Sequence, residues 1–171
     1  VGGTISGLTS SGMVLVNEFF RVVDEGRPRW WLMENVPGSP DCDGPAGYSV
    51  QRFTLDASQV GSEQRRLRKF HFGFQPGLSP LVIVRAPARS QLEPTVLATE
   101  GRRGRGRDWS RVCELQGLPR DFDLPNFTVE GKKRAVGNGV PFPMALALAR
   151  AVADASARTV TPFKLCPCGC G

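Results

Sequence analysis

The spacing of apolar side chains predicts a helix near the start of the chain and a strand after it. Over residues 13–25, apolar side chains recur at roughly helical spacing, and the pattern ends at Gly26. Residues 30–36 then form a short, almost wholly apolar run bounded by Pro28 and Pro37. Such a run is typical of a strand that is buried on both faces of a sheet.

Further along, two strands precede a long irregular segment and two helices. Residues 48–55 and 67–74 alternate well enough to predict strands, whereas residues 75–107 are rich in proline and show little periodicity. Helices are predicted over residues 108–116 and 141–157, the second with its prolines in the first turn, where they are tolerated. This order of elements suits the later part of an α/β domain.

Composition narrows the class of protein. The 171 residues match one domain or part of one. No apolar stretch approaches the length of about 18 residues that a membrane span needs, which argues against a transmembrane protein. The charged fraction of 22% and the aromatic fraction of 8% are ordinary for a globular chain and argue against wholesale disorder.

Charge and cysteine content point to a polyanionic partner and a reducing compartment. The chain has 22 basic and 16 acidic residues, a net charge of +6, and most of the basic residues are arginines, whose planar forks suit phosphate groups. Its five cysteines include three at the extreme C-terminus, and no secretory leader is visible. This pattern favours a cytoplasmic protein over a secreted disulfide framework.

The first segment with candidate chemistry is Glu34-Asn35-Val36, at the C-terminal end of the predicted buried strand. In open α/β sheets this edge is where ligands bind. We expect a carboxylate there to be poorly solvated, with its pKa raised enough for it to share or donate a proton. The alternative is a glutamate that ends the strand and caps the next turn.

Two further segments carry candidate binding groups. Gln64 begins a run in which Arg66 and Arg68 are two residues apart, so that both guanidiniums are predicted on one strand face, where they suit an anionic or carbonyl-rich ligand. The alternative is a solvated basic edge that discourages strand pairing. The Gly-Asn-Gly run at residues 137–139 predicts a close backbone approach to a ligand, with free amides before the last helix, although most such runs are turns.

Taken in order, these segments resemble the DNA cytosine-5 methyltransferase family. The chain has Glu-Asn-Val at 34–36, Gln-x-Arg-x-Arg at 64–68, Arg-Val-Cys-Glu-Leu-Gln-Gly-Leu-Pro-Arg-Asp-Phe at 111–122 and Gly-Asn-Gly-Val-Pro at 137–141. They match the family's Glu-Asn-Val, Gln-x-Arg-x-Arg, Leu-Gln-Gly-Phe-Pro-type and Gly-Asn-Ser-Val motifs in the family's order. The resemblance, which covers residues 13–157, implies an α/β class I methyltransferase (Rossmann-like) sheet, incomplete at its N-terminal side.

The resemblance also implies an activity, the transfer of a methyl group from S-adenosylmethionine to C5 of a cytosine flipped out of duplex DNA. Glu34 would contact N3 and the exocyclic amine of the cytosine, and Arg68 would hold its carbonyl oxygen. Arg66 would support the pocket and the surroundings of the nucleophile, Gln64 would order the turn, and Asn35 would fix the Glu34 loop through backbone contacts.

The family's contact to the methyl donor maps onto Asn138 and the backbone of Gly139. Gly139 stands where the family more often has serine, so one hydroxyl contact is lost while the amide is kept. The resemblance therefore implies S-adenosylmethionine as cofactor and double-stranded DNA as partner, in a bacterial or phage restriction-modification setting.

Two family motifs are missing from the matched region. The Phe-x-Gly-x-Gly cofactor turn and the Pro-Cys loop with the nucleophile both precede it in the family, and none of the five cysteines matches the nucleophile. We therefore expect a C-terminal fragment, from a sequence clipped at both ends or from one half of a split enzyme, that does not methylate DNA alone. An RNA-directed member of the family and a noncatalytic DNA-binding subunit are the alternatives.

This interpretation divides the chain into four consecutive segments. They are the end of the catalytic domain at 1–74, a very short recognition-like insert at 75–107, closing helices at 108–158 and a Cys-rich tail at 159–171.

The insert and the tail carry further candidate ligand groups. The arginines expected to track DNA phosphates, unless they lie in a merely solvated loop, are Arg102, Arg103, Arg105 and Arg107. The cysteines expected to form half of a zinc site, unless they are reactive or simply exposed thiols, are Cys166, Cys168 and Cys170.

Overall fold

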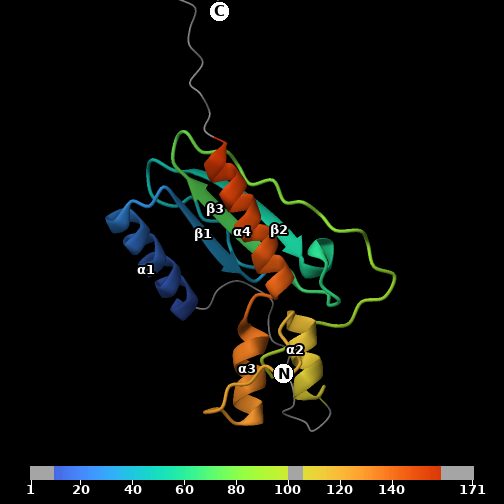
Figure 1. Cartoon of the computed structure of the whole chain (residues 1–171). Coiled ribbons are helices and arrows are strands. Elements are labelled where there is room, and N and C mark those ends of the chain that lie inside the picture. Colours follow the sequence, from blue (N-terminus) through green and yellow to red (C-terminus); the bar gives the residue numbers. More distant parts are fainter. Residues whose placement is uncertain (1–9, 100–105, 159–171) are drawn as a thin grey trace, which may run out of the picture. The chain divides into compact units, whose positions relative to one another are not determined.

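The computed structural model describes residues 10–99 and 106–158, a mixed α/β structure with a small three-stranded antiparallel sheet (Figure 1). The chain forms two compact units that interleave along the sequence, unlike the consecutive segments expected above. Unit 1 takes its described residues from 1–53, 69–82 and 152–171, and unit 2 takes them from 54–68 and 83–151.

Every helix and strand expected from the sequence is present, with small shifts at the ends. In chain order the elements are α1 (Ser10–Gly26), β1 (Trp30–Asn35), β2 (Ser49–Asp56), the 3₁₀ helix η1 (Ala57–Val60), β3 (Leu67–Phe74), α2 (Trp109–Gln116), α3 (Val129–Asn138) and α4 (Phe142–Ala157). The sequence-based prediction gives β3 its observed bounds and misses η1 and α3.

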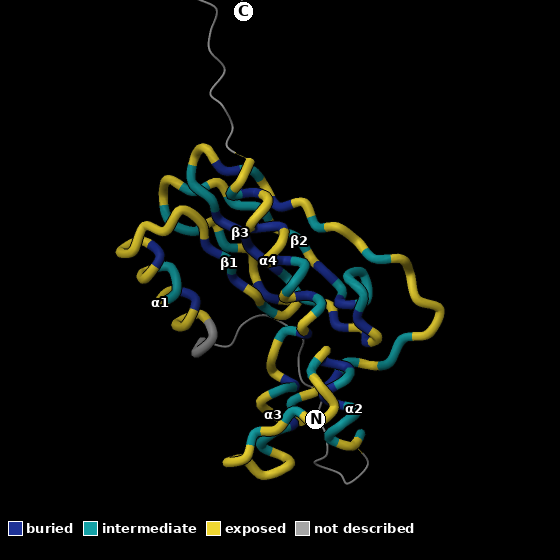
Figure 2. Tube along the Cα trace, viewed as in Figure 1, coloured by how far each residue is buried: buried dark blue, intermediate teal, exposed yellow. Residues whose placement is uncertain are grey.

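The sheet has the order β1-β3-β2, so β1 is an outer strand. β1 and β3 are antiparallel, with Trp30 opposite Phe74 and Asn35 opposite Lys69. Figure 2 shows alternating burial along β1, where Trp31 and Met33 are buried and Trp30 is exposed. The prediction of a strand buried on both faces is therefore wrong, because a strand covered on a single face buries only every second side chain.

The core of unit 1 lies between α1 and β1. Val16 and Val23, one helical face of α1, pack with Trp31 and Met33. Gly73 is directly opposite Trp31 in the β1–β3 ladder, and the indole occupies the space that a side chain at Gly73 would fill. A Cβ built on Gly73 would lie only 1.9 Å from the Trp31 ring, so this core requires glycine at that position.

Unit 2 contains α2 and α3, which lie side by side (Figure 1). Asp108 caps α2 by accepting a hydrogen bond from the Arg111 amide at 2.7 Å, and the helix ends at Gly117, whose φ of 74° is left-handed. α3 begins in the same way, since the Thr128 hydroxyl accepts a hydrogen bond from the Gly131 amide at 3.2 Å. Local capping therefore sets both helix starts.

One stretch of the described chain, Val129–Ala157, is a candidate membrane span by length and composition, which is weak evidence. The stretch is not one continuous helix, because α3 ends at Asn138, Gly139 is extended and α4 begins only at Phe142. The 16 residues of α4 are fewer than the roughly 20 that span a bilayer.

We predict that Gly73→Ala lowers the free energy of unfolding by about 3 kcal/mol, because the rigid indole of Trp31 cannot yield to a methyl group. Urea unfolding of the full chain, followed by circular dichroism, measures the change. Gly26→Ala at the end of α1 is the control, with an effect within about 1 kcal/mol, since its nearest neighbour is 4.0 Å away. Equal effects of the two substitutions would contradict this account of the core.

Candidate functional site

Gln64 lies at the centre of unit 2, with none of its surface exposed. Its amide nitrogen donates to the carbonyl of Leu115 at 2.5 Å, and its Oε1 accepts from the amide of Val96 at 3.0 Å. Both ends of one side chain thus join the segment before β3 to the end of α2 and to the insert. The sequence predicts that Gln64 orders a local turn, and in the structure its side chain also binds backbone groups of α2 and of the insert.

Arg66 is also buried, with 1% of its surface exposed. Nη1 donates to the carbonyl of Val96 at 2.9 Å, and Nη2 donates to the carbonyls of Gly137 and Gly139, each at 2.9 Å. The last carbonyls of a helix lack partners within the helix and carry partial negative charge, so a guanidinium at the end of α3 is favourable. The planar fork of arginine lets one side chain reach three acceptors.

These hydrogen bonds bring three sequence motifs together in unit 2. Gln64 and Arg66 of the Gln-x-Arg-x-Arg motif bind backbone groups of the Leu-Gln-Gly and Gly-Asn-Gly segments. Gln116 of α2 also links α2 directly to α3, since its side-chain amide donates to the carbonyl of Val136 at 2.8 Å. Segments that are far apart in the sequence are therefore connected through buried side chains.

The expected pair of ligand-binding guanidiniums is not found. β3 begins at Leu67, so Arg66 precedes the strand and its guanidinium is occupied by backbone carbonyls. Arg68 is half-buried and donates to the carbonyl of Leu67 at 2.9 Å. The one-face prediction is wrong because the alternation of a strand does not extend to the residue before it. Arg66 binds backbone carbonyls inside unit 2, and Arg68 is the arginine with an accessible surface. The support that Arg66 would give to a pocket and a nucleophile stays a prediction.

Asn138 and Gly139 form the end of α3 rather than a loop of free amides. Both are exposed, and the amide of Gly139 donates to the carbonyl of Val136 at 3.1 Å. The prediction that this amide is available to a methyl donor is therefore wrong in the described structure. The exposed side chain of Asn138 is the polar group that this segment offers to a ligand.

Glu34 and Asn35 end the outer strand of unit 1. The Asn35 Oδ1 accepts a hydrogen bond from the amide of Val36 at 2.9 Å, which is a local contact to the backbone just after Glu34. Glu34 itself is exposed, so the expectation of a poorly solvated carboxylate is wrong. The antiparallel, outer position of β1 leaves this residue open to water.

A second polar group in unit 1 consists of residues that no sequence motif contains. Lys69 of β3 contacts the Asp41 carboxylate at 2.6 Å and donates to the carbonyl of Ser39 at 2.8 Å, which ties the loop after β1 to the sheet. His71 is fully buried, with Nε2 3.5 Å from Asp41. Burial lowers the pKa of His71 below its ordinary value of 6.5, although Asp41 acts to raise it. Lys69 and His71 are two residues apart on one predicted strand, and this spacing is the sequence signal that could have revealed them as neighbours.

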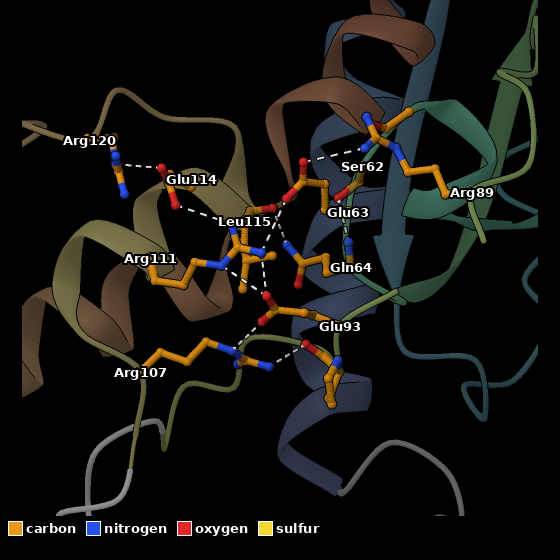
Figure 3. Close-up of polar contacts among 12 residues, drawn as sticks. Ser62, Glu63, Gln64, Arg89, Glu93, Arg107, Arg111, Glu114, Leu115 and Arg120 are labelled. Atoms are coloured by element: carbon orange, nitrogen blue, oxygen red, sulfur yellow. Dashed lines mark hydrogen bonds and ion pairs between the residues drawn. The ribbon is translucent and has the colours of Figure 1, made fainter. Parts of the chain in front are cut away.

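Arg107 anchors the end of the insert. Its Nε contacts Glu93 at 2.9 Å (Figure 3). Its Nη2 donates to the carbonyl of Pro94 at 2.9 Å, and Nζ of Lys133 donates to the backbone carbonyl of Arg107. The sequence predicts that Arg107 tracks DNA phosphates. Only 19% of its side chain is exposed, so it is poorly placed for that role.

The other insert arginines and the tail cysteines, namely Arg102, Arg103, Arg105, Cys166, Cys168 and Cys170, lie outside the described residues. Within residues 10–99 and 106–158, no group of three His, Cys, Asp or Glu side chains is arranged to hold a metal ion. The zinc interpretation of the tail stays a prediction.

Arg111 is the centre of an ion-pair network in unit 2 (Figure 3). Its guanidinium contacts Glu93, Glu63 at 3.2 Å and Glu114 at 3.1 Å. The carboxylates raise the pKa of Arg111, with Glu93 as the largest contributor. Hydrogen bonds from Arg111 and then Arg107 lower the pKa of Glu93. The network fastens the insert to α2. Arg111 and Glu114 belong to the Leu-Gln-Gly motif, whereas Glu63 and Glu93 lie outside every motif that the sequence singled out.

No protein-family model matches the chain, and no curated protein matches it either. The resemblance to cytosine-5 methyltransferases therefore rests on the four sequence motifs alone.

We predict that Arg66→Lys lowers the free energy of unfolding by about 2 to 4 kcal/mol, because an ammonium cannot reach three buried carbonyls. Arg68→Lys, the same change two residues later on a half-buried side chain, should cost less than about 1 kcal/mol. Urea unfolding of both variants of the full chain gives the comparison. A difference within error of zero would show that the Arg66 fork does not stabilise unit 2.

We also predict that stability falls in mild acid because of His71, the one histidine in the chain. Below about pH 6.5 the unfolded chain takes up a proton that the folded chain, with its lowered His71 pKa, does not bind. The free energy of unfolding should thus decrease as the pH falls from 6.5 toward the folded pKa, by at most about 1.4 kcal/mol per pH unit.

Urea unfolding between neutral pH and mild acid measures this slope. His71→Gln removes the titrating ring, so its stability should be flat with pH over the same interval, whatever its absolute value. A slope that is identical in both proteins would assign the pH dependence to other groups.

Proposed function

We propose that this chain is the C-terminal part of a DNA cytosine-5 methyltransferase, which transfers a methyl group from S-adenosylmethionine to C5 of cytosine in duplex DNA. Four motifs in the order of that family support the proposal. The proposal includes a class I methyltransferase sheet to which β1 and β3 belong, and a cytoplasmic bacterial or phage enzyme of restriction-modification type.

The observation that carries the proposal is the set of hydrogen bonds from Gln64 and Arg66 to the other motif segments of unit 2. Here two side chains of one motif bind the backbone of two others. This is the arrangement expected when separate motifs build one functional region.

In this proposal, the accessible groups act on the target base. Glu34 is exposed, so a flipped cytosine can reach its carboxyl, which would hold a proton toward N3 as charge develops in the ring. Arg68 would donate to the cytosine carbonyl oxygen. Arg66 and Gln64 are positioning residues, since their polar atoms bind backbone groups inside unit 2. The attacking cysteine would come from a Pro-Cys loop outside the matched segments.

The described residues fit only part of a methyl-donor site. The exposed side chain of Asn138 would hold S-adenosylmethionine, which supplies the methyl group when bound. The amide of Gly139 is hydrogen-bonded to Val136 and contributes no free donor. Most of the donor site must then come from elsewhere, as the family pattern implies.

A complementation assay tests the proposal. The full chain is mixed with a family polypeptide that carries the Phe-x-Gly-x-Gly and Pro-Cys motifs, and transfer of labelled methyl groups to cytosine C5 in duplex DNA is measured. We expect transfer with both components and not with either alone. Glu34→Gln should then lower the rate by about 100-fold or more, because proton transfer in the transition state is lost.

Glu25→Gln is the matched control, because Glu25 is also an exposed glutamate of unit 1 and pairs with Arg21 on α1. Its rate should equal that of the unchanged chain. Equal rates for the two variants would refute the role of Glu34, and methyl transfer to RNA in place of DNA would favour the RNA-directed alternative.

A further inference from the structure

Glu63 lies between two arginines on the surface of unit 2 (Figure 3). One carboxylate oxygen is 3.4 Å from Nη1 of Arg89, and the other is 3.2 Å from Nη2 of Arg111. Arg89 is further held by a hydrogen bond to the carbonyl of Gly61 at 3.1 Å. The exposed fractions are 46% for Glu63, 46% for Arg89 and 34% for Arg111, so solvent reaches part of each side chain.

The three side chains line two hollows in unit 2. The larger, of about 600 Å³, is also lined by Ser90 and Gln91, which supply neutral hydrogen-bond donors. The smaller, of about 250 Å³, lies against Ser62 and Glu114. The Glu63 carboxylate therefore lies between two arginines, and the hollows beside it have room for a larger anionic group.

The ion pairs of Glu63 are of the exchangeable kind. Exposed pairs contribute about 0 to 1 kcal/mol each and are screened by salt. A guanidinium binds phosphate with the same two-pronged geometry as carboxylate, so little is lost when one anion replaces the other. The neighbouring pair of Arg107 and Glu93 differs, because Arg107 is more buried and is also held through a backbone carbonyl.

We propose that a backbone phosphate of duplex DNA displaces the Glu63 carboxylate from Arg89 and Arg111. Glu63 therefore competes with the DNA phosphate for these two arginines. The choice of DNA as the source of the phosphate rests on the proposed function. The exchange makes and breaks no covalent bond. The Glu63 side chain rotates so that water solvates its carboxylate, and the phosphate accepts hydrogen bonds from the N–H groups of Arg89 and Arg111 that the carboxylate has left. Ser90 and Gln91 at the rim would add contacts to the phosphate or sugar.

The test is DNA binding by the full chain, measured by fluorescence anisotropy with a labelled duplex over a series of salt concentrations. Glu63→Gln should tighten binding by about threefold to tenfold, and it should steepen the dependence of log K on log salt by about 0.9 for each additional phosphate that the protein neutralises. Arg89→Ala should weaken binding and make that dependence shallower by a similar amount.

The pair Glu130–Arg134 on α3 provides a matched control. It has the same 3.4 Å separation, and its side chains are 52% and 53% exposed. Glu130→Gln and Arg134→Ala make the same charge changes elsewhere in unit 2 and should shift affinity much less. Equal shifts from Glu63→Gln and Glu130→Gln would show an effect of net charge alone and overturn the proposal.

Two other results would also overturn it: weaker binding by Glu63→Gln, and no salt-sensitive binding by any variant. Urea midpoints of the variants confirm that each is folded under the assay conditions. The binding assay is independent of the methyl-transfer assay. If methyl transfer fails and Glu63→Gln still tightens DNA binding, the enzymatic proposal is wrong while the role of Glu63 stands.

Discussion

Unit 2 depends on one buried guanidinium. Removing the charge of Arg66 from water is costly, and the cost is offset by hydrogen bonds to the carbonyls of Val96, Gly137 and Gly139. Gln64, two residues earlier, binds the amide of Val96 and the carbonyl of Leu115. Together these two side chains satisfy backbone groups that no helix or strand satisfies, at the end of α3 and in the irregular insert.

This arrangement separates the motif residues into two kinds. Gln64 and Arg66 are occupied by the protein's own backbone, so their contribution to any reaction is to hold the surrounding segments. Glu34, Arg68 and Asn138 have surface that a ligand can reach. Motifs in which some residues are buried and others are accessible can thus serve structure and chemistry at once, and the proposed methyltransferase function assigns the chemistry to the accessible residues. Glu63 belongs to neither kind, because its carboxylate pairs with the guanidiniums of Arg89 and Arg111 rather than with the backbone.

Local signals predicted the elements better than their arrangement. β3 has its predicted bounds because large and basic side chains alternate along it, and α2 is marked by Asp108 at its start and Gly117 at its end. α3 was missed because its first turns are rich in basic residues and contain Gly131, so that the Thr128 cap is the main signal. The apolar run of β1 suggested burial on both faces, but only Trp31 and Met33, on the face toward α1, are buried. The partners of Arg66 depend on long-range folding and could not be predicted from spacing.

The amide of Val96 tests this account most directly, because its hydrogen-bond acceptor is the side chain of Gln64 rather than a helix or strand. Native-state hydrogen exchange of the full chain should show Val96 protected as strongly as Val112, a buried amide of α2. In Gln64→Leu, Val96 should lose that protection before Val112 does. If Val96 exchanges freely in the unchanged chain while Val112 is protected, the buried Gln64 and Arg66 do not hold the motifs together.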